Sequence, residues 1–251
     1  MPRTSAALIT RQLTPAEFLA TEEALLDFCE DHTNHPGFLW FWESPNHFVV
    51  LGYGKHIAAE VNEPECQRRG IPILRRASGG GTVLQGPGCV NYTLILPMLP
   101  IDSRPELSSI SSTNIYVMQQ IHAALAPIVP GQLAIHGYTD LTIDSLKFSG
   151  NAQRRKKRSI LFHGSFLLDF NLDLISQVLQ EPAQQPEYRR HRPHRDFLRN
   201  LPVDRPTLTA SIQHTWQATT QSTPETIHEI TQRAANLITE KYSQDEWNRR
   251  F

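Results

Sequence analysis

The sequence predicts an α+β fold in which helices flank one mixed, largely antiparallel sheet. The chain contains more short apolar or alternating segments than amphipathic segments. The first kind is typical of β-strands and the second of helices. Most of these strand segments follow one another directly, whereas the strands of a parallel sheet alternate with helices. The composition, with 39% hydrophobic and 20% charged residues, is that of an ordinary globular protein.

The first helix has the clearest start signal in the chain. Residues 14–17 (TPAE) place a threonine at the N-cap, a proline in the first turn and a glutamate at the capping-box position. An apolar stripe follows and stops before the helix breakers of residues 34–36. We therefore expect a helix that covers one face of the sheet.

The remaining elements are predicted from hydrophobic periodicity and turn residues. Strands are expected over residues 38–42, 48–51, 71–74, 90–96, 133–135, 141–143 and 160–170. Further helices are expected over residues 112–125, 172–179 and 224–242. Residues 184–205 are rich in proline, arginine and histidine, so we expect an irregular loop that crosses the surface.

Composition and charge exclude several classes of protein. The three cysteines have neither disulfide-framework nor metal-finger spacing, and neither a secretory signal nor a membrane-length apolar segment is visible. We therefore expect a cytoplasmic protein that does not bind a membrane. Residues 147–199 carry 11 Lys and Arg against five Asp and Glu, although the whole chain has a net charge of −1. This basic stretch is either a solvated surface or a docking site for an acidic partner, and nucleic acid is not the expected partner.

The strongest functional motif is the glycine-rich stretch of residues 75–88 (RRASGGGTVLQGPG). Three successive glycines lack a Cβ, so a ligand can lie against the backbone, and the exposed N–H groups can face an anion. Arg76 adds a guanidinium that suits phosphate or carboxylate. The stretch is neither a Walker loop nor a dinucleotide fingerprint. The alternative is a glycine-rich hairpin loop without a ligand.

A second motif lies about 65 residues further on, at residues 146–152 (LKFSGNA). Lys147 is expected to enter from a strand beside a turn of small residues. Taken alone, such a lysine is a solvated surface residue. Together with the glycine-rich stretch, it suggests a cation that faces a bound anionic intermediate.

The order of these motifs resembles the lipoate–protein ligase family, the lipoyl branch of the biotin/lipoate protein ligase catalytic domain. The resemblance covers about residues 14–200. It rests on Arg76-x-Ser78-Gly79-Gly80-Gly81-Thr82-Val83, Asn91-Tyr92, Asp140-Leu141, Lys147-x-Ser149-Gly150-Asn151-Ala152-Gln153 and His163-Gly164-Ser165. It implies a catalytic domain at residues 14–205, with residues 206–251 forming a helical extension packed on it rather than an independent domain.

The resemblance also implies a reaction and its residues. Lipoate or octanoate would be activated with ATP and Mg²⁺ to an acyl-adenylate and then transferred to a lysine of an acceptor lipoyl domain. Lys147 would be catalytic, and Asp140 would hold the magnesium ion unless it is an ordinary turn aspartate. The implied acyl-adenylate and ATP site consists of Arg76, Ser78, Gly79, Gly80, Gly81, Thr82, Val83, Leu84, Lys147, Gly150, Asn151 and Ala152. We expect His163 to be a hydrogen-bonded core histidine.

Departures from the family pattern suggest alternatives. Only about 50 residues follow the catalytic region, too few for the C-terminal accessory domain of many relatives, so an accessory subunit could replace that domain. An octanoyl or lipoyl carrier-protein acyltransferase of the same fold would need a cysteine, but none follows Cys89, which we expect to be a buried apolar residue. A non-catalytic lipoyl-binding protein is the third alternative. The basic run of residues 154–158 is either a solvated hairpin tip or a docking site for an acidic lipoyl domain.

Overall fold

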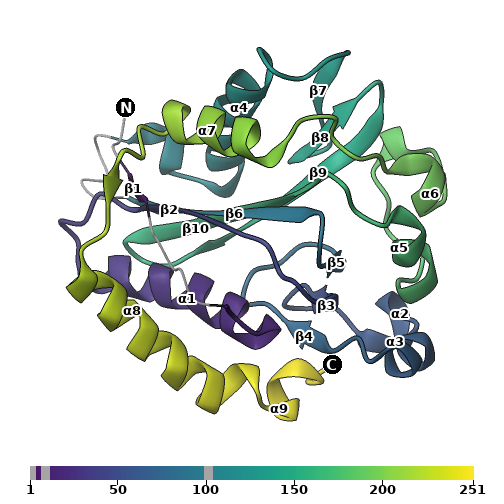
Figure 1. Ribbon diagram of the computed structural model, residues 1–251, viewed down its shortest axis with the longest axis horizontal. Coiled ribbons are helices and arrows are strands. Elements are labelled where there is room, and N and C mark those ends of the chain that lie inside the picture. The colour runs from purple at the N-terminus through teal and green to yellow at the C-terminus, as the bar shows by residue number, and fades with distance from the viewer. Residues whose placement is uncertain (1–3, 7–11, 99–103) are drawn as a thin grey trace.

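An eight-stranded sheet crosses the centre of the molecule, and helices cover both of its faces (Figure 1). The computed structural model describes residues 4–6, 12–98 and 104–251. The strand order is β11-β1-β2-β6-β10-β9-β8-β7. These strands are β1 (Ser5–Ala6), β2 (Phe38–Trp42), β6 (Cys89–Pro97), β7 (Leu133–His136), β8 (Asp140–Ile143), β9 (Leu146–Arg155), β10 (Ser159–Leu167) and β11 (Thr220–Gln221).

The large sheet is antiparallel except at one edge, where β1 pairs in parallel with both β2 and β11. The long central strand β10 pairs with β6 on one side and with β9 on the other. Gly164 of β10 therefore lies opposite Tyr92 of β6 and Asn151 of β9. This arrangement confirms the predicted α+β class with a mixed, largely antiparallel sheet. It also brings the lysine motif and the His163 motif onto neighbouring strands.

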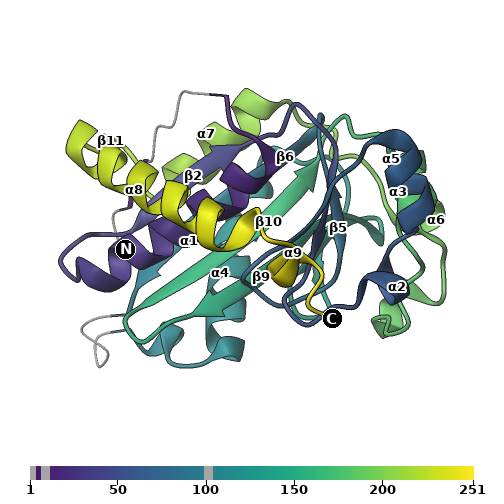
Figure 2. The same ribbon diagram turned by 90° about the horizontal axis from the view of Figure 1, so that it is seen from below.

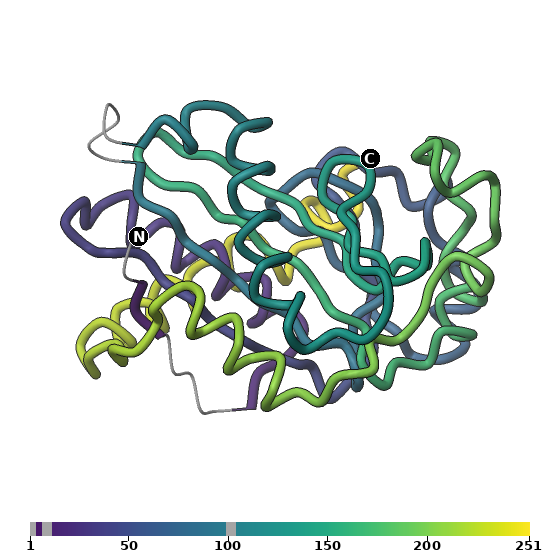
Figure 3. Tube along the Cα trace, turned by 90° about the horizontal axis from the view of Figure 1, so that it is seen from above, coloured from purple at the N-terminus to yellow at the C-terminus, as the bar shows by residue number. Residues whose placement is uncertain are grey.

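Two pairs of helices cover the faces of this sheet. Helix α1 (Pro15–Asp31) and helix α8 (Pro224–Leu237) lie on one face (Figure 2), and α4 (Ile110–Leu125) and α7 (Arg205–Thr215) lie on the other (Figure 3). The predicted capping box of α1 is present, because Thr14 and Glu17 each bond the other's backbone N–H. Each helix pair buries its apolar residues against one side of the sheet.

A second, three-stranded sheet holds the glycine-rich stretch beside the large one. Its strand order is β4-β3-β5, with β3 at Phe48–Leu51, β4 at Ile73–Arg75 and β5 at Val83–Gln85. The short helices α2 (Ile57–Glu60) and α3 (Glu63–Arg69) connect β3 to β4. Residues 76–82 therefore form the β4–β5 connection, which this sheet fixes at both ends.

Several elements differ from the sequence prediction. The predictions missed β1, β5, β11, α2, α3, α7 and α9 (Asp245–Asn248) and the extent of β9, and they expected one sheet where there are two. The expectation of a turn of small residues beside Lys147 was wrong. Residues 149–152 belong to β9, because pairing with β10 overrides the turn preference of glycine and asparagine. Residues 184–205 are less irregular than expected. They contain the turn η3 (Glu187–Arg189) and helix α6 (His194–Phe197), and they follow helix α5 (Leu172–Val178).

The C-terminal residues continue from α8 through a π-helical turn, η4 (Ile238–Tyr242), to the short helix α9 (Asp245–Asn248). The buried carboxylate of Glu23 on α1 accepts hydrogen bonds from Lys241 and from the hydroxyl of Tyr242. Residues 224–248 thus pack along α1 and end beside β4 (Figure 1). The division of the chain at residue 205 stays a prediction. In the described parts of the chain, no helix is long and apolar enough to cross a membrane.

The β8–β9 turn gives a stability prediction. Asp144 and Ser145 have φ angles of 53° and 64°, in the left-handed region where an L-residue is strained. We expect Ser145→Gly to raise the free energy of unfolding by about 0.5–1 kcal/mol, since glycine adopts this region without strain. Denaturant unfolding would measure the change. Ser111→Gly, on the exposed face of α4, is the control and should lower stability. A loss of stability in both variants would contradict the prediction.

Candidate active site

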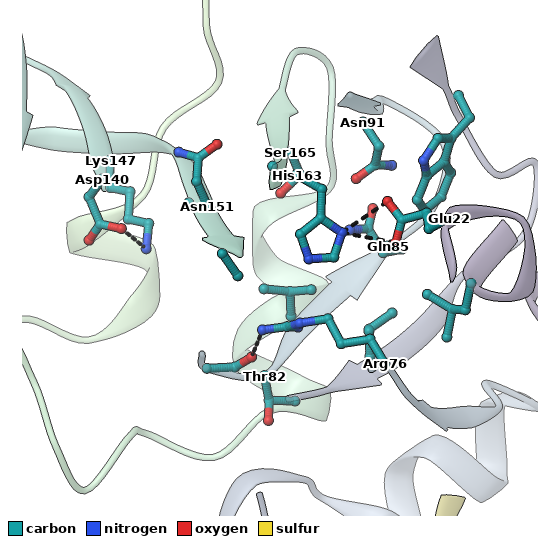
Figure 4. Close-up of a pocket in the computed structure, with 18 residues that line it drawn as sticks. Glu22, Arg76, Thr82, Gln85, Asn91, Asp140, Lys147, Asn151, His163 and Ser165 are labelled. Carbon is teal, nitrogen blue, oxygen red and sulfur yellow. Dashed lines mark hydrogen bonds and ion pairs between the residues drawn. The ribbon is translucent and has the colours of Figure 1, made fainter. Parts of the chain in front are cut away.

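Two adjoining cavities meet between the glycine-rich stretch and β9. The smaller, of about 180 Å³, lies between α1 and strands β2, β3, β5, β6, β9 and β10. The larger, of about 490 Å³, extends toward α2, α5 and α6. Both cavities are lined by Gly81, Thr82, Val83, Asp140, Lys147, Gly150 and Ser165. Figure 4 shows the smaller cavity, with Lys147 and Asp140 at one side and Glu22, Gln85 and Asn91 at the other.

Arg76 is a buried cation that binds its own loop. Its guanidinium donates to the carbonyls of Gly79 and Gly81 and to the hydroxyl of Ser78. Burial lowers the pKa of Arg76 to about 10, which still leaves it charged at neutral pH. Among the described residues, no carboxylate forms an ion pair with it. The carboxylates of Glu22 and Glu60 stabilise its charge from a distance, without a direct ion pair, so Arg76 can still attract an anion in the adjoining cavity.

A chain of hydrogen bonds runs from this loop to α1. The hydroxyl of Ser78 lies 2.7 Å from His163 Nε2, and His163 Nδ1 lies 2.9 Å from both carboxylate oxygens of Glu22. Thr93 also donates to Glu22, at 2.7 Å. His163 is therefore buried and hydrogen-bonded, as expected, and it also lines the smaller cavity. These contacts also fix the position of Ser78, which accepts from Arg76.

Lys147 is held at the junction of the two cavities by a second polar chain. Its ammonium lies 2.7 Å from Asp140 Oδ1, and Tyr188 donates to Asp140 Oδ2 at 2.6 Å. A Cβ on Gly150 would lie only 3.0 Å from Lys147 Nζ, so the glycine of the motif leaves the space that the lysine side chain occupies. The two cations that the sequence singled out, Arg76 and Lys147, thus line the same cavity.

Comparison with known proteins identifies the family of this fold. The model of the lipoyl protein ligase A/B catalytic domain matches residues 14–214. The chain belongs to this family. The match extends beyond residue 205, the predicted end of the catalytic domain, through helix α7.

Relatives of the chain include both kinds of enzyme found in the family. The octanoyltransferase LipM of Brevibacillus brevis is 27% identical, over 97% of this chain and 98% of that protein. Two solved structures share the fold. One, from a study of the bi-partite lipoate protein ligase of Thermoplasma acidophilum and its E2 lipoyl domain, has a TM-score of 0.78 and 21% identity, covering 99% of this chain and 97% of that one. The other is a lipoate-protein ligase A bound with ATP, with a TM-score of 0.76, 21% identity and 98% coverage of both chains.

Most of the residues predicted to bind the acyl-adenylate line at least one cavity of this lipoyl ligase domain. Only Ser78 and Gly79 of the predicted set line neither. Asn151 lines the smaller cavity, but its amide is engaged: it donates to the carbonyl of Thr139 and accepts from the hydroxyl of Tyr92. Gly164 allows this contact, because a Cβ there would overlap Asn151 Oδ1. The roles of these residues in binding stay predictions.

The prediction that Asp140 holds magnesium does not fit the contacts around it. One oxygen of Asp140 is paired with Lys147 and the other accepts from Tyr188. Among the described residues, no group of three His, Cys, Asp or Glu side chains is placed to hold a metal ion. The contacts of Asp140 therefore do not fit a magnesium ion held by this side chain.

The larger cavity contains residues that the sequence did not indicate. Lys55 and Glu60 come from the β3–α2 region, and Arg189, His194 and Phe197 come from the segment expected to be a surface loop. These residues are far apart in sequence and carry no local motif. For Arg189 and His194 the one signal was the excess of positive charge between residues 147 and 199, and Lys55 and Glu60 had none.

Most side chains of the basic run, residues 154–158, bind other parts of the molecule. They therefore do not form a free docking surface for a partner. Arg154 donates to the carbonyl of Ala77 beside the glycine-rich stretch, and Arg155 donates to Leu107 and Thr113. Lys156 and Arg158 are bound to Asp27 and Glu30 of α1. These side chains join β9 and β10 to neighbouring elements, which leaves Lys157 as the one residue of the run without a described partner.

The cysteines lie outside both cavities. Cys29, Cys66 and Cys89 are buried and free of disulfides. Burial raises the pKa of Cys89 to about 12 and that of Cys66 to about 11, so both thiols are protonated at neutral pH. Cys89 is therefore a buried apolar residue, as expected, and not a thiolate nucleophile in this arrangement.

Proposed function

We propose that the protein is an ATP-dependent lipoate–protein ligase. In the first step, a carboxylate oxygen of the acid attacks the α-phosphorus of ATP. An oxygen–phosphorus bond forms, the bond to the β-phosphate breaks, and pyrophosphate leaves. In the second step, the amine of an acceptor lysine attacks the acyl carbonyl. A carbon–nitrogen bond forms, AMP leaves with the electrons of the broken carbon–oxygen bond, and the amine loses a proton.

The observation that carries this proposal is the pair of cations that line the smaller cavity, one of which, Lys147, also lies at the junction with the larger cavity. Adenylation brings a carboxylate against a polyphosphate, so like charges meet and further negative charge develops. Arg76 is buried without a direct ion pair among the described residues, and Lys147 lines the same cavity from β9. Preorganised cations of this kind stabilise developing negative charge more than water does. A cation at the junction can serve both half-reactions, because the α-phosphate and the acyl carbonyl meet there.

The two cavities differ in a way that suits an acyl group and a nucleotide. The smaller one has the apolar side chains of Leu19, Trp42 and Val50 and a volume of about 180 Å³. A buried cavity of about 150 Å³ holds benzene, so this one suits a medium-chain acid such as lipoate or octanoate rather than a long fatty acid. The larger cavity, of about 490 Å³, would take ATP. A lipoate-protein ligase A of the same fold has been solved with ATP bound, which supports ATP as a ligand of this fold.

Partners follow from the second half-reaction. The acceptor would be a lipoyl domain, as in the Thermoplasma acidophilum system that pairs a bi-partite ligase with its E2 lipoyl domain. An accessory subunit for adenylation, a magnesium ion delivered with ATP, and a cytoplasmic location remain parts of this proposal.

The second candidate is transfer of an octanoyl or lipoyl group from a carrier protein without ATP. The similarity to octanoyltransferase LipM, which extends over nearly the whole chain, favours it. Such a transfer through a thioester needs an accessible thiol. In the described parts of the chain, no cysteine lines either cavity, and the thiol nearest to the site, Cys89, is buried beside Ser165. This geometry favours the ligase.

One experiment separates the candidates. A lipoyl domain is incubated with the protein and either lipoate, ATP and Mg²⁺ or an octanoylated carrier protein alone, and its mass is measured. We expect modification only with ATP, accompanied by pyrophosphate release, and we expect Cys89→Ser to retain most activity because a mixed anhydride needs no thiol. Transfer without ATP that is lost in Cys89→Ser would establish the transferase. Lipoate binding without pyrophosphate release would indicate a non-catalytic lipoyl-binding protein.

A further inference from the structure

Lys55 is a cation of the larger cavity that neither the motifs nor the reaction above has used. It lines this cavity together with Gly80 and Gly81 of the glycine-rich stretch. Its ammonium has one described partner, Glu60 Oε1, at 2.9 Å. An ammonium group has three donors, so two remain for a ligand. Because a third of the Lys55 side chain is exposed, its ion pair with Glu60 is weak and can be exchanged for a stronger anion.

The other cations of this cavity are less available. Lys147 is paired with Asp140 at the junction with the smaller cavity. The guanidinium of Arg189 is almost fully buried, where it binds Glu181 and the carbonyl of Arg192 and lies over the ring of Phe197. If the α-phosphate of ATP binds at the junction, the β- and γ-phosphates lie further into the larger cavity and need a cation there. Because Lys147 lies at the junction and Arg189 is buried, Lys55 is the remaining cation, among the described residues of the cavity wall, that can meet them.

The backbone that carries Lys55 is fixed by a buried arginine, Arg75. Its guanidinium donates to the carbonyls of Gly52, Tyr53 and Lys55 at 2.6–3.1 Å. The same loop is bonded to the glycine-rich stretch, since the N–H of Tyr53 donates to the carbonyl of Ser78. A Cβ on Gly52 would overlap the carbonyl oxygen of Gly80, so the two loops lie in direct contact.

The C-terminal helix α9 holds the other side of Arg75. The Arg75 guanidinium donates to the carbonyls of Trp247 and Asn248, at the last turn of α9. The backbone N–H of Arg75 donates to Asn248 Oδ1, and the indole N–H of Trp247 donates to the carbonyl of Arg75 at 2.7 Å. A positive charge at this end of a helix is favourable, because the unpaired carbonyls carry partial negative charge.

From these contacts we propose that Lys55 binds the β- and γ-phosphates of ATP, and that helix α9 acts through Arg75 as a positioning element for the Lys55 loop. The proposal rests on the proposed ligase function and adds a residue to its first half-reaction. Lys55 would stabilise the charge that develops on pyrophosphate as the bond between the α-phosphorus and the bridging oxygen breaks. The second half-reaction has no pyrophosphate, so Lys55 has no part in it.

The test measures the two half-reactions separately on the full-length protein. Pyrophosphate release with lipoate, ATP and Mg²⁺ reports adenylation, and modification of a lipoyl domain by chemically prepared lipoyl-AMP reports transfer. We expect Lys55→Ala to lower kcat/KM for ATP about 10- to 100-fold and to leave transfer unchanged. Lys55→Arg should restore most of the loss, because it keeps the charge. Lys157→Ala, at the exposed tip of the β9–β10 hairpin, is the matched control and should change neither.

A separate pair of variants tests the positioning role of helix α9. Asn248→Ala removes contacts to Arg75 and to the carbonyl of Tyr242, and we expect it to raise KM for ATP several-fold without changing KM for lipoate. Thermal unfolding of each variant checks that it is folded, and Trp247→Phe serves as a milder second variant. Equal loss of both half-reactions in Lys55→Ala, or no loss in either, would overturn the proposal. A wild-type protein that releases no pyrophosphate with any acid would instead contradict the proposed function.

Discussion

Lys147→Ala should lower modification of the acceptor domain by about 10²- to 10³-fold, the usual effect of deleting one preorganised donor at developing charge. Lys147 lines both cavities, so both half-reactions should fall, in contrast to the single half-reaction expected for Lys55. The measurement is the rate of pyrophosphate release and of lipoyl-domain modification, each under saturating substrate.

A second variant tests whether the position of the ammonium matters as well as its charge. Gly150→Ala keeps Lys147 but places a Cβ 3.0 Å from its Nζ, so the end of the side chain must shift by a few tenths of an ångström from its place beside Asp140. We expect a smaller loss than in Lys147→Ala, in the same two half-reactions. Retention of near wild-type rates in Lys147→Ala would remove Lys147 from the mechanism and leave Arg76 as the one cation of the smaller cavity that the sequence predicted.

Local signals were sufficient for much of the fold. The capping box of α1 and the two aromatic and apolar strands β2 and β3 were predicted to the residue, because their start signals and alternation are local. The extent of strand β9 was missed because its local residues favour a different structure from the one that it adopts. Its centre contains Ser149, Gly150 and Asn151, which favour turns in isolation, and pairing with both β8 and β10 overrides that preference.

Only the site residues that lie in sequence motifs could be predicted. Arg76 and Lys147 lie in motifs, and the structure brings them to one cavity from different sheets. Glu22, Lys55 and Tyr188 have no motif, because they reach the site through tertiary packing of α1, the β3–α2 loop and residues 184–205. The basic run of residues 154–158 was interpreted by charge alone, whereas the partners that engage it, Asp27 and Glu30, come from a helix more than a hundred residues away in sequence.

Gly81→Val should abolish binding of lipoyl-AMP while leaving the protein as stable as the wild type. Gly81 lines both cavities, has no positive φ angle, and a Cβ built on it meets no atom within 4 Å. The added side chain would therefore fill space that the ligand needs and that the empty protein leaves open. We expect the affinity for lipoyl-AMP, measured by calorimetry, to fall by at least about 100-fold, since a steric clash with a rigid loop cannot be relieved cheaply.

Gly80 is less suitable for this test, and Gly54 supplies the control. Gly80 has a φ angle of 91°, and its Cβ would lie 2.9 Å from the Arg76 guanidinium, so substitution there would disturb the loop itself. Gly54 is exposed, lines neither cavity and also has open space at the Cβ position. Gly54→Val should leave lipoyl-AMP affinity unchanged. If Gly81→Val binds lipoyl-AMP as well as Gly54→Val does, the ligand does not lie against this backbone, and the glycine-rich stretch is a structural loop of the small sheet.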